Sequence, residues 1–276
     1  MAIEAGFTGA KGRRIFTQSW LPEGTPRDHI VLTHGYAEHS GRYDAVGRFL
    51  AERGFAIHAL DHHGHGKSEG ARAVIARFAQ ADADIDTLVD KVRADSGLAT
   101  VKLIGHSMGG SLALNYALNH QAKLSGLVLS GPAIGGKMAR GTRWLLAVIS
   151  TFAPQRGTIA LDANAVSRDP AVVADYIADP LVFRGKVPAR TAHEMFKAIH
   201  SYPARVGALV VPCLLMHGEA DALVSAKLAA PLFEGIASAD KTVRIWPGLF
   251  HEIFNEPERE EVLGVTADWL EAHAAR

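Results

Sequence analysis

Short apolar runs recur along the chain, and turn residues such as glycine, proline and aspartate close each of them. Unbroken apolar runs of this length are typical of parallel strands that are buried on both faces of a sheet. The chain before residue 29 is different, because residues 14–21 read as part of an antiparallel hairpin at the sheet edge. The predicted parallel strands are 30–33, 55–60, 101–104, 127–129, 213–216 and 243–246.

Helix-length segments separate most of these runs. Strands that alternate with helices indicate βαβ units and a parallel sheet covered by helices. We therefore predict an α/β fold with a mostly parallel sheet. The predicted helices are 42–52, 77–94, 108–120, 224–236 and 258–273.

One interval interrupts this alternation. The roughly eighty residues between Pro132 and Pro212 lack a clear buried strand, and an interval that long is rarely a bare loop. We expect an inserted helical cap at 134–206, above a core made of 1–133 and 207–276. Glycines at 135 and 136 would allow a hinge near its start.

The first part of this cap, residues 144–152, is apolar on nearly every side of the expected helix. Such a helix is usually buried, which predicts a cap core. The same composition also fits a wall for an acyl chain or a contact with a membrane. We place Leu145 and Ile149 on the path of a substrate acyl chain as a hypothesis.

The pattern G-x-S-x-G occurs twice, around Ser107 and around Ser68. A nucleophilic serine of this type sits on a sharp turn between a buried strand and a helix. Ser107 has this context, whereas Ser68 follows a loop rich in glycine and histidine. The sequence predicts Ser107 as the nucleophile, although its position would also suit an ordinary helix N-cap.

The loop 61–68 allows two other interpretations. Its last three residues match the end of a phosphate-binding loop, but Asp61 stands where that loop has its first glycine. Its three histidines suggest a metal site, yet no second group of ligands at suitable spacing accompanies them. We predict a polar loop beside the mouth of the active site, with no bound metal.

A serine hydroxyl needs a base to take its proton, and the base needs an acid to orient it. In this fold the acid and then the histidine follow the serine along the chain, each beyond the end of a strand. His251 follows the last predicted strand, and Asp221 follows the strand before it. We assign His251 as general base and Asp221 as its orienting acid, with Glu219 as the rival acid.

Catalysis by such a serine also needs backbone N–H groups that stabilise the negatively charged oxygen of the intermediate. One comes from the residue after the nucleophile, and the other comes from the loop after an early strand. These positions are Met108 and Tyr36.

Composition narrows the classes of partner. The formal net charge is zero, so nothing suggests a general attraction to nucleic acid. The single cysteine, Cys213, cannot form an intrachain disulfide, which is compatible with a reducing compartment. No signal-peptide pattern begins the chain, and no apolar run reaches the roughly 20 residues of a membrane span. We expect a cytoplasmic protein.

Seven sequence blocks together resemble the monoacylglycerol lipase family of α/β-hydrolases. They follow the order of that family through nearly the whole chain, so the match is specific as a set. The blocks are His34–Tyr43, Asp61–Gly70, Gly105–Gly110, Ser167–Pro170, Asp179–Leu181, His217–Asp221 and Pro247–Glu252.

The resemblance implies hydrolysis of monoglycerides to glycerol and fatty acid, with no cofactor, beneath a mobile helical cap. It implies that Glu38, Arg42 and Tyr176 bind the glycerol end. Glu38 and Arg42 could equally form an exposed ion pair of little energetic weight. Mammalian members have a second histidine where this chain has Phe254, which implies a different glycerol contact.

Several alternatives stay open on the sequence alone. A lysophospholipase, a thioesterase or a general carboxylesterase would use the same catalytic residues. A non-enzymatic binding protein of this fold would be expected to lack some of them. The expected partner is a small lipid ester, with transient contact to a membrane or micelle through the cap.

Overall fold

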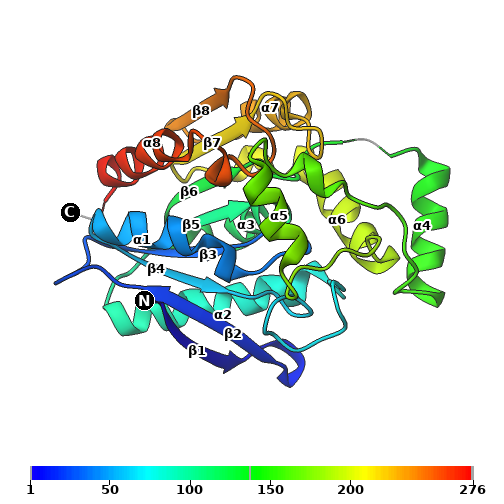
Figure 1. The fold of residues 1–276 in the computed structure, drawn as a ribbon, viewed down its shortest axis with the longest axis horizontal. Coiled ribbons are helices and arrows are strands. Elements are labelled where there is room, and N and C mark those ends of the chain that lie inside the picture. The colour runs from blue at the N-terminus through cyan, green and yellow to red at the C-terminus, as the bar shows by residue number, and fades with distance from the viewer. Residues whose placement is uncertain (1, 137, 275–276) are drawn as a thin grey trace.

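A computed structural model describes residues 2–136 and 138–274. Eight strands form one sheet in the order β1-β2-β4-β3-β5-β6-β7-β8 (Figure 1). The first hairpin and its pairing with β4 are antiparallel, and every other neighbouring pair is parallel. The strands are β1 Ile3–Thr8, β2 Arg14–Trp20, β3 Asp28–Thr33, β4 Phe55–Leu60, β5 Val101–His106, β6 Leu124–Ser130, β7 Cys213–Gly218 and β8 Lys241–Trp246.

Helices cover both faces of this sheet. Alternate residues of a strand point to opposite faces, so Ile30 and Leu32 of β3 pack with α1 and α8, whereas Val31 packs with α2 and α3. The α-helices are α1 Asp44–Glu52, α2 Phe78–Ser96, α3 Met108–His120, α4 Arg140–Phe152, α5 Pro170–Ala178, α6 Ala189–Ser201, α7 Ala226–Glu234 and α8 Arg259–Ala272. Short 3-10 helices are η1 Ala10–Gly12, η2 Ser40–Tyr43, η3 Gln121–Lys123, η4 Ala163–Ala165, η5 Tyr202–Ala204, η6 Val206–Ala208 and η7 Ile253–Asn255.

The predicted fold class is confirmed by this architecture. Each predicted strand lies within an observed one, and each predicted helix overlaps its counterpart, differing by at most a few residues at the ends. The edge hairpin is present as β1 and β2. Within the described ranges, no helix has the length and apolar character needed to cross a membrane.

The interval between β6 and β7 contains α4, α5 and α6, which lie beyond the carboxyl ends of the parallel strands (Figure 1). The prediction that residues 144–152 form buried core is wrong. Trp144 is 70% exposed and Phe152 is 85% exposed, because α4 packs mainly against α6 and buries only Leu146 and Ser150. The division into a core and a cap at 134–206 stays our interpretation.

Candidate active site

Ser107 occupies the sharp turn between β5 and α3. Its backbone has φ 54° and ψ −119°, a conformation that side-chain-bearing residues rarely adopt and that is common at functional turns. The backbone N–H of Ser107 donates to the Ser130 carbonyl at 3.0 Å. Its side chain makes no capping hydrogen bond with α3. Ser107 is therefore the N-cap residue of α3 by position, but its hydroxyl is not used to cap the helix.

Glycines on both sides allow this turn. A Cβ atom on Gly109 would lie 2.2 Å from the Thr33 carbonyl oxygen, and one on Gly105 would lie 2.5 Å from the Gly109 carbonyl oxygen. The Thr33 hydroxyl donates to the Gly109 carbonyl at 3.0 Å. The small residues predicted around the serine are thus required for close packing of β3, β5 and α3.

His251 and Asp221 meet at the carboxyl ends of β7 and β8. His251 Nδ1 lies 2.7 Å from Asp221 Oδ2, and both side chains are buried. The other oxygen, Oδ1, accepts the backbone N–H groups of Leu223 and Val224, each at 2.8 Å. Glu219 is exposed. Of the two acids that the sequence left open, Asp221 is the one in contact with His251.

A second histidine supports the Asp221 carboxylate. The His217 Nε2–H lies 3.1 Å from Asp221 Oδ2 and 2.7 Å from the Val224 carbonyl oxygen. Burial alone would raise the pKa of Asp221, but hydrogen bonds from His217 and His251 outweigh it and hold the pKa below its ordinary value. His217 lies in a block quoted for the family resemblance, but its spacing alone gave it no role.

Ser107 and His251 line one cavity of about 250 Å³. His106 lines the same cavity, with its ring centroid 4.7 Å from that of His251. Burial, followed by the neighbouring His251, lowers the pKa of His106 to about 3, so this ring is neutral. Apolar side chains from the interval between β6 and β7 and from the β7–α7 segment supply much of the remaining wall: Ile159, Leu161, Val187, Met195, Phe196, Ile199, Leu223 and Leu228.

Residues 34–38, here called the oxyanion loop after the role that the sequence predicts for Tyr36, follow β3 and lie against this cavity. Gly35, Tyr36 and Glu38 line it. Ala37 has φ 71°, so the loop reverses direction tightly after Tyr36. Among the described residues, the buried Tyr36 hydroxyl has no hydrogen-bond partner. The loop therefore presents backbone and side-chain groups of Tyr36 near the cavity that holds Ser107.

Glu38 and Arg42 form a buried network rather than an exposed pair. Glu38 is 3% exposed, and its Oε2 lies 2.9 Å from Arg42 Nη1. Arg42 also donates to both carboxylate oxygens of Glu252, at 2.6 and 2.8 Å. The interpretation as an exposed ion pair is wrong, because both side chains are largely buried and a second carboxylate, from Glu252, joins them.

Tyr176 of α5 packs against the Arg42 side chain of this network. Its ring lies 4.7 Å from the Arg42 guanidinium carbon and lines the cavity together with Glu38 and Glu252. Among the described residues that line the cavity, Arg42 does not appear. The structure thus places three of these polar groups at the cavity surface and Arg42 behind them.

The hypothesis for Leu145 and Ile149 needs correction. The described residues that line the cavity include neither of them. Leu145 is 52% exposed on α4, and Ile149 packs at the edge of the main core. Helix α4 packs chiefly against α6, which lies between most of α4 and the sheet (Figure 1). Phe254, for which the resemblance implied a different glycerol contact, is buried in the core beneath α8.

Ser68 has a structural position. Its hydroxyl donates to the Asp61 carbonyl at 2.6 Å and accepts the Phe16 N–H at 2.8 Å. The prediction that residues 61–68 form a polar loop at the mouth needs correction for its histidines. His62 and His65 are buried, because both pack against His34. In the part of the chain that the structure describes, no three acidic, cysteine or histidine side chains are grouped as metal ligands.

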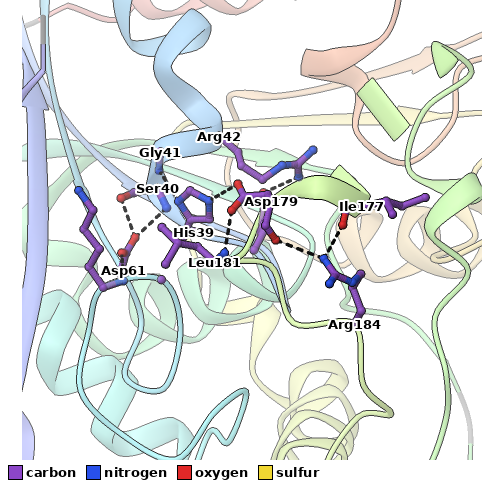
Figure 2. Close-up of polar contacts among 12 residues, drawn as sticks. His39, Ser40, Gly41, Arg42, Asp61, Ile177, Asp179, Leu181 and Arg184 are labelled. Atoms are coloured by element: carbon purple, nitrogen blue, oxygen red, sulfur yellow. Dashed lines mark hydrogen bonds and ion pairs between the residues drawn. The ribbon is translucent and has the colours of Figure 1, made fainter. Parts of the chain in front are cut away.

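Segments of the core and of the cap interval meet at the loop after β3. Figure 2 shows His39 Nε2 against Asp179 Oδ2, at 2.8 Å, with the Leu181 N–H donating to Oδ1 of the same aspartate at 2.7 Å. Ser40 donates through its N–H and its hydroxyl to Asp61, at 2.8 and 2.6 Å. The His39–Asp179 contact ties the region between β6 and β7 to the residue that follows the oxyanion loop.

Comparison with known proteins agrees with this architecture. The family described as "serine aminopeptidase, S33" matches residues 24–258. A monoacylglycerol lipase of Mycolicibacterium smegmatis is 39% identical over 98% of this chain and 97% of its own length. The chain belongs to the monoacylglycerol lipase family of α/β-hydrolases.

Two further members of this family extend the match. Human monoglyceride lipase is 34% identical over 90% of this chain and 82% of its own. The crystal structure of the monoacylglycerol lipase of Paleococcus ferrophilus covers 99% of this chain and 100% of its own, with a TM-score of 0.83 and 30% identity. The family match therefore spans both the sheet and the helical interval between β6 and β7.

Proposed function

We propose that this chain hydrolyses monoacylglycerols to glycerol and a fatty acid through an acyl-enzyme on Ser107. The observation that carries the proposal is a single cavity with two kinds of wall. Ser107 and His251 lie on it, apolar side chains surround much of it, and Glu38, Glu252 and Tyr176 add polar groups. A monoacylglycerol has the matching halves, one long apolar chain and one polyol.

In the proposed reaction, the Ser107 oxygen attacks the ester carbon while His251 Nε2 takes the hydroxyl proton. Asp221 accepts the Nδ1–H of His251, which fixes the tautomer and stabilises the imidazolium. The C–O bond to glycerol then breaks, and His251 returns the proton to the glycerol oxygen. Water repeats the two steps on the acyl-enzyme and releases the fatty acid.

We assign the backbone N–H groups of Tyr36 and Met108 to the oxygen that becomes negative in each step. The support is positional, since Met108 follows the nucleophile directly and Tyr36 lies on the oxyanion loop that lines the cavity. Two such donors, already oriented, stabilise the transition state more than the substrate.

The proposal places the acyl chain along the apolar part of the wall, formed by residues such as Leu161, Met195 and Leu228. The glycerol hydroxyls would donate to carboxylate oxygens of Glu38 or Glu252, with Tyr176 beside them. The exposed aromatic face of α4, which lies outside the cavity, is proposed to contact a membrane or micelle while the substrate enters.

A substrate panel with the purified chain tests this function. Monooctanoyl and monooleoyl glycerol, the matching diacylglycerols, lysophosphatidylcholine and octanoyl thioesters are compared by kcat/KM, with Ser107→Ala as the inactive control. We expect the monoacylglycerols to exceed every other class by at least about tenfold, a difference of about 1.4 kcal/mol in transition-state binding. Preference for the lysophospholipid or the thioester would assign the chain to that class instead.

A further inference from the structure

Two loops must keep a fixed distance for the proposed reaction to proceed. The oxyanion loop carries the Tyr36 N–H, and the loop 247–255, here called the base loop, carries His251. They follow β3 and β8, which are not neighbours in the sheet. Sheet hydrogen bonds therefore do not set the spacing between the two loops directly.

Glu38 shapes the oxyanion loop from within. Its Oε1 accepts the Gly35 N–H at 2.6 Å and the Tyr43 hydroxyl at 2.7 Å. Its Oε2 accepts from Arg42 at 2.9 Å. Both oxygens of this carboxylate are thus engaged by the protein itself, and the first of these contacts fixes the His34–Gly35 peptide, which adjoins the peptide that carries the Tyr36 N–H.

Glu252 ties the base loop to the same arginine. It directly follows His251, and its two oxygens accept separate N–H groups of Arg42 at 2.6 and 2.8 Å. Asn255 Nδ2 adds a further donor at 2.9 Å. A planar guanidinium that holds a carboxylate through two parallel bonds restricts both its distance and its orientation.

Burial makes these contacts strong constraints. Glu252 is 5% exposed, and the Arg42 side chain is 10% exposed beneath the Tyr176 ring. Burial lowers the pKa of Arg42, but Glu252 and Glu38 outweigh this and raise it above its ordinary value, so the guanidinium stays charged. Removing one partner of a buried ion pair leaves an uncompensated charge, so the remaining carboxylates would shift toward water.

We propose that Arg42 is a positioning residue that locks the oxyanion loop to the base loop through Glu38 and Glu252. This role differs from contact with glycerol, since Arg42 lies behind the cavity wall. The inference rests on the proposed function for its choice of substrates. Loss of the lock should displace the Tyr36 N–H relative to His251, which slows every ester alike.

The test compares Arg42→Lys and Glu252→Gln with the wild type on two octanoate esters, monooctanoyl glycerol and methyl octanoate. Lysine keeps the charge but cannot form two parallel hydrogen bonds with a carboxylate. Glutamine keeps the shape of Glu252 without its charge. The concentration of active enzyme is measured by complete labelling of Ser107 with a fluorophosphonate, so that unfolded protein does not contribute to kcat. Arg48→Lys, an exposed ion pair with Asp44 on α1, is the matched control.

We expect kcat of both variants to fall about ten- to a hundredfold on both esters, with KM of Arg42→Lys changed less than about twofold, since misplacement by about 1 Å can cost a hundredfold. Affinity for an octyl trifluoromethyl ketone, which forms a tetrahedral adduct, should fall by the same factor as kcat/KM. A rise in KM of Arg42→Lys confined to the glycerol ester, or full activity in both variants, would overturn the role of Arg42. If the wild type cleaves only methyl octanoate, the proposed substrate class fails while the comparison on that ester still decides the lock.

Discussion

At the residue scale, Ser107 and Ser68 share one five-residue pattern and have different surroundings. Ser107 lies on a strained turn at the cavity, whereas the Ser68 hydroxyl is engaged by the backbone of Phe16 and Asp61. The identical pattern thus occurs once on a turn that exposes the side chain and once in a loop that uses it for packing. Context, rather than the pattern, separates the two.

Ser107→Ala should abolish hydrolysis of monooctanoyl glycerol, because no other hydroxyl at the turn can form the acyl-enzyme. Ser68→Ala should retain most activity and lose about 1 kcal/mol of unfolding free energy, because it leaves the Phe16 N–H without its acceptor. Steady-state kinetics and urea unfolding measure the two effects. An inactive but folded Ser68→Ala enzyme would refute the assignment.

Asp221→Asn should lower kcat by about 10²–10⁴, because the imidazole loses the carboxylate that orients it and can take the wrong tautomer. Glu219→Gln is the control, since Glu219 is exposed two residues away and should change kcat little. Initial rates on p-nitrophenyl octanoate, with folding checked by circular dichroism, give the ranking. The reverse order would transfer the role to Glu219.

At the scale of elements, the cavity wall and the exposed apolar surface lie on different helices, α6 and α4. The sequence had offered residues 144–152 for both. Helix α6 contributes Met195, Phe196 and Ile199 to the cavity wall, whereas α4 leaves Trp144 and Phe152 largely exposed. Large apolar side chains that are exposed to water favour an interaction surface for an apolar partner. The two helices therefore call for separate experiments.

Met195→Trp should shorten the acyl-binding part of the cavity. Each methylene that no longer fits loses up to about 0.8 kcal/mol of binding, so kcat/KM should fall more for monooleoyl than for monobutyryl glycerol. Leu145→Trp is the matched control, because Leu145 is half exposed on α4 and outside the cavity wall. A chain-length profile that changes only in the control would place the acyl chain along α4 after all.

The double variant Trp144→Ser and Phe152→Ser should weaken binding to phosphatidylcholine vesicles, because both side chains are largely exposed and available for insertion. Activity on a soluble butyrate ester should stay within about twofold, since α4 lies outside the cavity wall. Vesicle sedimentation and ester kinetics test the two parts. Unchanged sedimentation would remove α4 from the lipid contact.

At the scale of the whole molecule, several histidines are partly or fully buried and neutral. Burial, followed by neighbouring His29, lowers the pKa of His58 to about 4, and burial lowers the pKa of His65 to about 3. A histidine in the unfolded chain has a pKa near 6.5. Between these values the unfolded chain binds more protons than the folded one, so stability falls as pH falls.

His58→Gln should therefore flatten the pH dependence of unfolding between about pH 6.5 and 4. Each buried neutral histidine contributes up to about 1.4 kcal/mol per pH unit in that window. His58 hydrogen-bonds Ser19 and His29 on the sheet, away from the cavity, so kcat should change little. Urea unfolding at several pH values measures the slope, and an unchanged slope would contradict the neutral state of His58.

The sequence by itself determined the elements and their order, since the information lies in neighbouring residues. A buried parallel strand needs only a short apolar run, and the turn at Ser107 needs only glycines beside it. The serine, the acid and the histidine each follow a different strand, and the order of those strands along the chain gives the order of the three residues. Family membership likewise rested on local blocks, and the comparisons agree with it.

Tertiary structure decided which distant residues meet. Arg42 and Glu252 are separated by 210 positions, so no local pattern could connect them, and the sequence left Arg42 as a surface ion pair or a glycerol contact. The choice between Asp221 and Glu219 likewise required the position of His251. The exposed side of α4 follows from where α6 packs, because an apolar helix reveals its composition but not which of its faces is covered.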